Sequence, residues 1–245
     1  MSIADKLVTV AENTPKVYEA GKKAEYDKFW DAFQENGNRT AYSRAFSGRH
    51  WNEQNFNPKY RIAPTSATYM FENFNNDTLW ENRRIRFDIS KYEIDFSTIT
   101  DASYLFYNSR VEGLFCDLRN ATKIFYAFGS PNNGSIENLT IRVSEKCTDY
   151  GYAFYYQTLT TRIIFTEDSV IAASVSFAQT GSLSRESIES IISAISETVT
   201  GKTLTLNKSA VNKAFETGTG LKDGANSTEW QALVATKPNW TISLS

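Results

Sequence analysis

One short motif recurs along the middle of the chain and limits what the chain can fold into. Each copy leads from a small or polar run into a phenylalanine, and the clearest copy reads TDYGYAFYYQ at residues 148–157. The five copies are residues 65–71, 100–106, 119–125, 148–154 and 171–177, which end in Phe71, Phe106, Phe125, Phe154 and Phe177. Repeats roughly 20–50 residues apart are typical of chains built from stacked units. We therefore predict that the five phenylalanines fill one interior layer.

Extended segments with alternating apolar residues lie between and after these copies. They are residues 85–89, 111–116, 136–143, 159–165 and 202–206. Such alternation indicates strands with one buried face. A single short strand cannot bury its apolar side alone, whereas stacked copies can lay each strand beside the previous one in a parallel sheet. The pattern predicts an α/β solenoid with short parallel strands.

The combination of Ala-Phe with a following Leu-x-x-Ile-x-Ile pattern resembles the BspA-type leucine-rich repeats of bacterial surface and phage proteins. It is found at residues 152–164 and 136–141, and the resemblance covers residues 63–206. It implies a leucine-rich-repeat-like solenoid with N-terminal helices and a helix-containing C-terminal cap. The first, third and fifth copies depart from the pattern, which leaves the unit boundaries open there.

The N-terminal part of the chain predicts two helices. Residues 2–13 form the first, and residues 15–36 form the second, whose aromatic residues share one face by their spacing. A short apolar seam begins in the first helix and consists of Ile3, Leu7, Val10 and Val17. A seam of this length needs a partner, because short helices are marginal alone in water. The first helix either folds back as a cap or joins the chain to other copies or to a larger assembly.

The chain divides into four segments on this interpretation. They are an N-terminal helical attachment or oligomerisation segment at residues 1–38, a connector at 39–64, the repeats at 65–183, and a C-terminal repeat and cap at 184–245. Within the last segment we predict helices at residues 184–198, 208–215 and 228–235, and strands at 202–206 and 240–244. Such terminal units cover the exposed ends of a stacked core.

The N-terminal segment carries a second resemblance. Residues 1–7, 17–23 and 29–37 are similar to the leader of proteins found among tail genes of phages and prophages of gut Firmicutes. Those proteins often carry a leucine-rich-repeat body. The resemblance implies a location in a virion, with attachment through the N-terminal helices.

Composition argues against several classes of function. The formal net charge of −2 in 245 residues does not fit a nucleic-acid footprint, which needs clustered positive charge. No apolar run reaches the length of a membrane span, and the first residues do not read as a signal peptide. We expect Cys116 and Cys147 to be buried as small hydrophobic residues.

No catalytic or metal site is indicated by the sequence. The single histidine, His50, has no recognisable nucleophile or acid partner. Cysteine and histidine do not cluster as zinc ligands do, so we expect neither metal nor cofactor. Acidic residues are plentiful, but their spacing singles out no pair for glycoside hydrolysis.

The exposed residues of the predicted strands are the candidate binding surface. They alternate with the core residues and are Arg84, Arg86, Asp88, Asp117, Thr140 and Arg142. Three tyrosines that follow a repeat phenylalanine, Tyr107, Tyr126 and Tyr155, either pack between units or provide contact area, and we favour packing. A host surface protein or a glycan is the expected ligand, and the residues do not identify it further.

We therefore predict a non-enzymatic structural or receptor-binding protein of a phage or prophage tail. It would contact virion or other proteins through its N-terminal helices and could self-associate. The first alternative is a bacterial BspA-like adhesion or protein-interaction protein, at the cell surface or in the cytoplasm. The second is a carbohydrate-active enzyme. Fold analogy alone does not decide among them.

Overall fold

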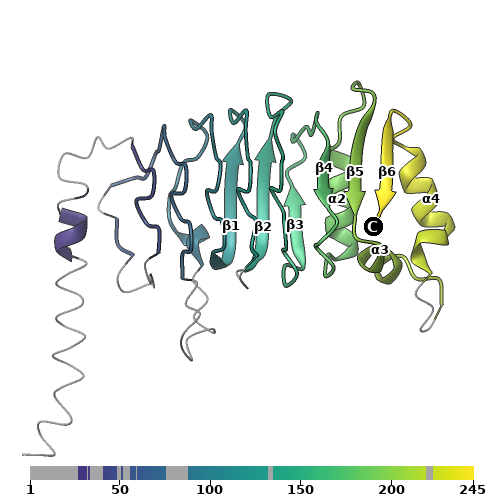
Figure 1. Cartoon of the computed structure of the whole chain (residues 1–245), viewed down its shortest axis with the longest axis horizontal. Coiled ribbons are helices and arrows are strands. Elements are labelled where there is room, and N and C mark those ends of the chain that lie inside the picture. Colours follow the sequence, from purple (N-terminus) through teal and green to yellow (C-terminus); the bar gives the residue numbers. More distant parts are fainter. Residues whose placement is uncertain are drawn as a thin grey trace, which may run out of the picture.

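A computed structural model describes most of the repeat region and the C-terminal part. The described residues are 27–31, 33, 41–48, 51, 56–58, 60–75, 88–131, 135–218 and 223–245. The elements are η1 (Ile89–Lys91), β1 (Arg110–Leu118), β2 (Ser135–Val143), β3 (Arg162–Phe165), β4 (Val175–Phe177), α2 (Arg185–Ala194), β5 (Lys202–Leu206), α3 (Lys208–Ala214), η2 (Gly224–Asn226), α4 (Thr228–Ala235) and β6 (Trp240–Leu244). They follow one another along an elongated molecule (Figure 1).

Tight turns stacked on one another form one wall of the molecule. The turns are residues 41–48, 66–74, 101–109, 122–130 and 148–157. Alternate backbone N–H groups of each turn donate to carbonyls of the next turn; Tyr104 donates to Phe125 and Phe106 to Ala127, at 2.9 and 2.7 Å. Buried backbone groups need such partners, so the recurring motif is a unit of a hydrogen-bonded stack.

A column of phenylalanine rings runs inside this stack. Its members are Phe46, Phe71, Phe106, Phe128, Phe154 and Phe177. The interior layer was therefore predicted correctly, but its third member was wrong. Phe128 takes the position assigned to Phe125, because the Ala127–Phe128 pair is equivalent to Ala153–Phe154. The Phe125 ring instead lies outside the column, beside Gly151.

The opposite wall begins as a three-stranded parallel sheet in the order β1-β2-β3. Val111 pairs with Ile136 and Leu118 with Val143, so the buried residues of neighbouring strands lie side by side. The strands expected at residues 111–116, 136–143 and 159–165 are present as β1, β2 and β3. The strand expected at 85–89 lies mostly outside the described residues, and Ile89 begins η1.

The prediction of a leucine-rich-repeat-like solenoid is wrong. Its strands were expected to continue one sheet, whereas they form two separate three-stranded parallel sheets in an α/β structure. Helix α2 ends the first sheet, because its serines occupy the free edge of β3. Ser187 Oγ accepts a hydrogen bond from the backbone of Ile163 at 3.0 Å, and Ser190 Oγ accepts one from Phe165 at 2.9 Å.

The second sheet, in the order β4-β5-β6, follows the wall of turns. The Phe177 ring of β4 stacks on Phe154 of the last turn, with ring centroids 4.4 Å apart. In Figure 1 the arrows of this sheet point opposite to those of β1–β3. The chain therefore switches walls after β3: helices take the place of strands on one side, and strands take the place of turns on the other.

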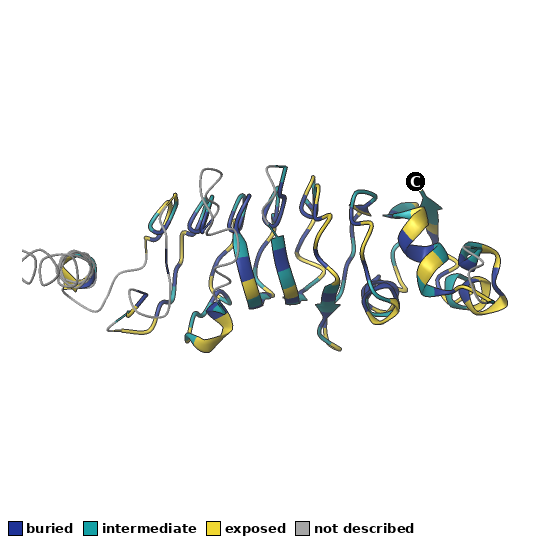
Figure 2. Cartoon of the chain, turned by 90° about the horizontal axis from the view of Figure 1, so that it is seen from below, coloured by how far each residue is buried: buried dark blue, intermediate teal, exposed yellow. Residues whose placement is uncertain are grey.

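Most C-terminal elements were predicted closely. β5 and α4 coincide with residues 202–206 and 228–235, β6 with 240–244, and α3 ends one residue early. Ser184 caps α2 by accepting a hydrogen bond from the backbone of Ser187. The helix expected at 184–198 ends at Ala194, because Ile195 forms a parallel bridge with Ile171. Figure 2 shows buried residues along the whole described length.

An aromatic cluster lies at the N-terminal end of the described chain. Residues 27–31 and 33 are helical, and Phe29, Trp30 and Phe33 share one face, as their spacing predicted. This face packs on Phe46 of the first turn. Trp51 joins the cluster. The seam of Ile3, Leu7, Val10 and Val17 lies outside the described residues, as does His50.

The remaining expectations concern the cysteines and the membrane. Cys116 and Cys147 are free and buried, as expected for small apolar side chains. Burial raises the pKa of the Cys147 thiol to about 11. None of the helices in the described ranges is long and apolar enough to cross a membrane.

Candidate functional site

Four tyrosine rings stack along the outside of the wall of turns. This tyrosine ladder consists of Tyr69, Tyr104, Tyr126 and Tyr152, one from each successive turn. The centroids of neighbouring rings are 4.4, 5.3 and 4.8 Å apart, and the planes of each pair lie within 12° of parallel. Tyr107 and Tyr155 meet the ladder edge-on. Tyr107, Tyr126 and Tyr155 thus contact rings of neighbouring turns, as expected for packing between units, but Tyr155 also lines the cavity described below.

Each ladder tyrosine has a left-handed backbone, with φ between 53° and 59°. This conformation costs a residue with a Cβ atom roughly 1–2 kcal/mol. Contacts between aromatic rings return about 0.5–1.5 kcal/mol each, and each tyrosine backbone also joins the hydrogen bonds between turns. The tight turn therefore places every ring directly over its predecessor.

The two ends of the ladder differ. At one end the guanidinium of Arg44 lies 4.2 Å from the ring centroid of Tyr69 and also pairs with Glu72 at 2.9 Å. At the other end Tyr152 is 56% exposed, and the next unit supplies no stacking ring, because Val175 precedes Phe177 where Tyr152 precedes Phe154. The first end is covered, whereas one face of Tyr152 has no stacked aromatic ring among the described residues.

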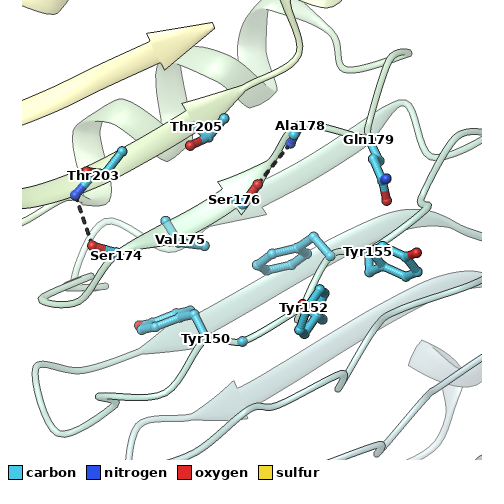
Figure 3. Close-up of a pocket in the computed structure, with 12 residues that line it drawn as sticks. Tyr150, Tyr152, Tyr155, Ser174, Val175, Ser176, Ala178, Gln179, Thr203 and Thr205 are labelled. Atoms are coloured by element: carbon cyan, nitrogen blue, oxygen red, sulfur yellow. Dashed lines mark hydrogen bonds between the residues drawn. The ribbon is translucent and has the colours of Figure 1, made fainter. Parts of the chain in front are cut away.

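A cavity of about 430 Å³ opens at this uncovered end, between the last turn and the second sheet. We call it the Tyr152 cavity (Figure 3). Its lining residues are Tyr150, Gly151, Tyr152, Phe154, Tyr155, Ser174, Val175, Ser176, Ala178, Gln179, Thr203 and Thr205. Its volume lies within the roughly 300–1,000 Å³ range of small-molecule sites.

The cavity exists because the hydrogen-bonded stack is interrupted here. In the preceding turn, Tyr126 and Phe128 each donate a backbone hydrogen bond to the next turn at 2.9 Å. The equivalent N–H groups of Tyr152 and Phe154 have no such bond to β4 within the described chain. The edge of the last turn at Tyr152 therefore remains available to a ligand, whereas Phe154 is buried.

Further hydrogen-bonding groups line the cavity. Gln179 Oε1 is buried and has no hydrogen-bond partner among the described residues, whereas the buried hydroxyl of Tyr150 interacts with the thiol of Cys147. Ser174 Oγ accepts from the backbone of Thr203 at 3.0 Å, and Ser176 Oγ from Ala178 at 3.3 Å, so each hydroxyl proton can still be donated (Figure 3). In Figure 3 the amide of Gln179 points toward Tyr155.

The cavity is electrically neutral. Its lining includes no acidic or basic side chain. Burial raises the pKa of Tyr150 well above its ordinary value, and burial together with Tyr152 and Tyr155 raises the pKa of Tyr126. These phenols therefore stay protonated near neutral pH, and the site offers aromatic faces with uncharged donors and acceptors.

The predicted binding residues lie elsewhere, on and beside the first sheet. Arg84 and Arg86 fall outside the described residues. Asp88 caps η1 by accepting from the backbone of Ser90 at 3.0 Å. Asp117, Thr140 and Arg142 lie on adjacent strands, with Asp117 opposite Arg142 in the register.

The charged side chains among these predicted binding residues on the strands already form ion pairs. Asp117 Oδ2 lies 3.6 Å from an Arg142 nitrogen, and its Oδ1 accepts from Arg119 Nε at 2.9 Å. Arg142 also pairs with Asp168. Burial raises the pKa of Asp117, but the hydrogen bonds and charges of Arg119 and Arg142 outweigh it and hold the pKa below its usual value. These side chains mainly compensate one another.

Sequence reasoning missed the Tyr152 cavity. The stretch at residues 148–157 was assigned to the repeat, although its four tyrosines are the densest aromatic group of that motif. This density of tyrosines could have indicated a binding site from the sequence alone. Nothing in the sequence indicates that Ser174, Ser176 and Gln179 line the same cavity, because their position depends on the chain switching walls after β3.

Among the described residues, no group of three or more histidine, cysteine or acidic side chains is arranged to hold a metal ion. Comparison of the chain with protein-family models, curated proteins and solved structures finds no match.

Proposed function

We propose that the chain is a non-enzymatic recognition protein of a phage or prophage tail, and that the Tyr152 cavity is its ligand site. The observation that carries the proposal is the interrupted stack, which leaves the aromatic face of Tyr152 and the exposed hydroxyls of Ser174 and Ser176 at one cavity. A rigid scaffold with exposed tyrosine and uncharged hydrogen-bonding groups suits selective binding. The tail location rests on the resemblance of the N-terminal residues.

The polar groups of the cavity favour binding over catalysis. General acid–base chemistry needs a group that titrates near the working pH, and the lining consists of phenols, hydroxyls and an amide. The acidic hollow formed with Asp95 and Asp117 is a poorer candidate for glycoside hydrolysis. Hydrogen bonds from Ser97 and the charge of Arg61 lower the pKa of Asp95, and that of Asp117 is also low, whereas the catalytic acid needs a raised pKa.

Cell binding tests the recognition role. The fluorescently labelled full chain is incubated with a panel of gut Firmicutes cells and measured by flow cytometry. We expect binding to a subset of strains and its loss in Ser176→Tyr, which fills the cavity from β4. Tyr60→Ala is the matched control, because Tyr60 is 51% exposed and outside the cavity lining. Equal binding by Ser176→Tyr, or no binding to any strain, would contradict the role.

Immunogold labelling separates the tail location from the bacterial adhesion alternative. A strain that carries the gene is treated to induce its prophages, and both particles and cells are labelled with antibody against the chain. We expect gold on the tails of released particles. Label confined to the cell envelope would instead support an adhesion protein.

A further inference from the structure

We propose, on the basis of the recognition role above, that the Tyr152 cavity binds a neutral saccharide whose ring stacks on Tyr152 in the position of a missing ladder ring. The ladder repeats a flat ring every 4.4–5.3 Å and then ends at a cavity. A ligand with one flat apolar face can continue this spacing. A pyranose ring has such a face in its axial C–H groups, and hydroxyls around its edge.

The polar groups of the cavity match that edge. Ser174 and Ser176 are exposed and can each donate a hydroxyl proton, and the backbone N–H of Tyr152 has no hydrogen-bond partner among the described residues. A polar group that a bound ligand covers without pairing it carries a desolvation cost. A ligand that carries several hydroxyl groups removes that cost, whereas a purely aromatic ligand would leave most of these groups unpaired.

Charged ligands fit poorly in this cavity. Transferring a charge out of water costs several kcal/mol when no opposite charge compensates it, and the lining supplies none. Sialic acids, phosphorylated sugars and acidic peptides are therefore disfavoured. The inferred class is that of neutral hexoses, deoxyhexoses and N-acetylhexosamines.

An extended peptide added as a strand is also disfavoured, although the turn edge is unpaired. A strand needs about 4.8 Å between its neighbours on each side. Below the cavity, however, Phe154 and Phe177 stack directly, with centroids 4.4 Å apart. The two units are thus already in contact in the core, and the space between them is a surface cavity closed at its base.

Saturation-transfer difference NMR on the full chain tests the inference, with methyl glycosides of glucose, galactose, N-acetylglucosamine and rhamnose as probes. We expect at least one probe to give saturable signals, strongest for the protons of one ring face. Tyr152→Ala should weaken its affinity by about tenfold or more through loss of the stacking surface, and Tyr60→Ala should leave it unchanged. Thermal unfolding shows whether each variant folds.

Ser176→Tyr keeps the inference falsifiable if Tyr152→Ala does not fold. Ser176 is exposed on β4, and a ring there occupies the cavity without removing any core side chain. We expect this variant to fold and to lose saccharide binding. The inference is overturned if no probe saturates, or if Ser176→Tyr binds as tightly as the unchanged chain.

The two proposals can fail separately. In one outcome the chain binds cells, Ser176→Tyr abolishes that binding, and no neutral glycoside binds. This outcome would overturn the saccharide inference and keep the recognition role. In the other outcome a glycoside binds in a way that depends on Tyr152, but the chain binds no cell. This outcome would support the saccharide inference and overturn the recognition role.

Discussion

Tyrosine in the left-handed backbone region recurs in this protein where most turns would use glycine or asparagine. Tyr69, Tyr104, Tyr126 and Tyr152 all adopt it, and each ring lies on the ring of the neighbouring turn. The Cβ atom of each tyrosine makes this backbone conformation costly, and the stacking of its ring offsets that cost. The two effects can be separated at a single position.

Replacing Tyr104 by alanine and by glycine separates them. Both variants lose the ring between Tyr69 and Tyr126, but only alanine retains the strain of a Cβ atom at φ 58°. We expect both to be less stable than the unchanged chain, with Tyr104→Gly the more stable of the two by about 1 kcal/mol. Denaturant unfolding measures both. Equal stability, or a more stable alanine variant, would show that the backbone is not strained.

The free energy of unfolding at acidic pH should depend on Asp117. Its folded-state pKa is lowered, so its contribution is present above the unfolded value, about 3.9, and is lost as the pH falls through the folded value. We expect Asp117→Asn to reduce stability at pH 7 and to lose less stability than the unchanged chain on acidification below pH 4. Unfolding at both pH values measures this. An exposed control, Glu145→Gln, should change neither.

At the scale of elements, serine hydroxyls decide where a sheet ends. Ser187 and Ser190 bring a helix to the edge of β3, where the repeat pattern predicts another strand. The alternating strands and the amphipathic helix at 184–198 could be predicted because each has its own periodicity. The division into two sheets could not, because it depends on which neighbour satisfies the backbone of β3.

The same limit explains the error at the third motif copy. Phe125 and Phe128 both follow small or apolar residues, and local pattern alone does not decide which ring enters the core. The hydrogen bond from Phe128 to Ala153 fixes the choice through contact between turns. The Tyr152 cavity escaped prediction for a related reason, since its two sides belong to units that the sequence places in one continuous stack.

Two glycines test the packing of the C-terminal elements. A Cβ atom on Gly224 would lie 2.5 Å from the backbone oxygen of Asn212 and 2.7 Å from that of Val211, in α3. Gly181 has ordinary clearance, with its nearest neighbour, Asn207, at 3.7 Å. We expect Gly224→Ala to lower the free energy of unfolding by about 2 kcal/mol or more. Gly181→Ala should change it by less than about 0.5 kcal/mol. Similar effects in thermal or denaturant unfolding would show that η2 is not packed closely on α3.

At the scale of the whole molecule, the aromatic helix at the N-terminal end covers the first turn. Trp30 is 2% exposed and contacts Phe46, Trp51 and Phe56. Removal of this helix would expose several rings at once, which favours association or loss of structure.

A chain that starts at residue 39 tests this covering role. We expect it to bind a hydrophobic dye, to unfold at a lower denaturant concentration and to aggregate in light scattering as its concentration rises. The full chain measured in parallel is the control. A truncated chain that stays monomeric with an unchanged midpoint would show that the first helices serve assembly rather than covering. If the full chain is also oligomeric, the assembly interpretation gains further support.

The direction of the turn-to-turn hydrogen bonds also has a mechanical consequence. These bonds run from one unit to the next along the long axis of the molecule (Figure 1). A pulling force applied at the two ends would load these bonds together with the strand pairs of the opposite wall and the ring contacts of the core, and the junctions would bear the force in series. The molecule would then lengthen in steps, one turn at a time, with each released unit adding on the order of 80 Å of extended chain.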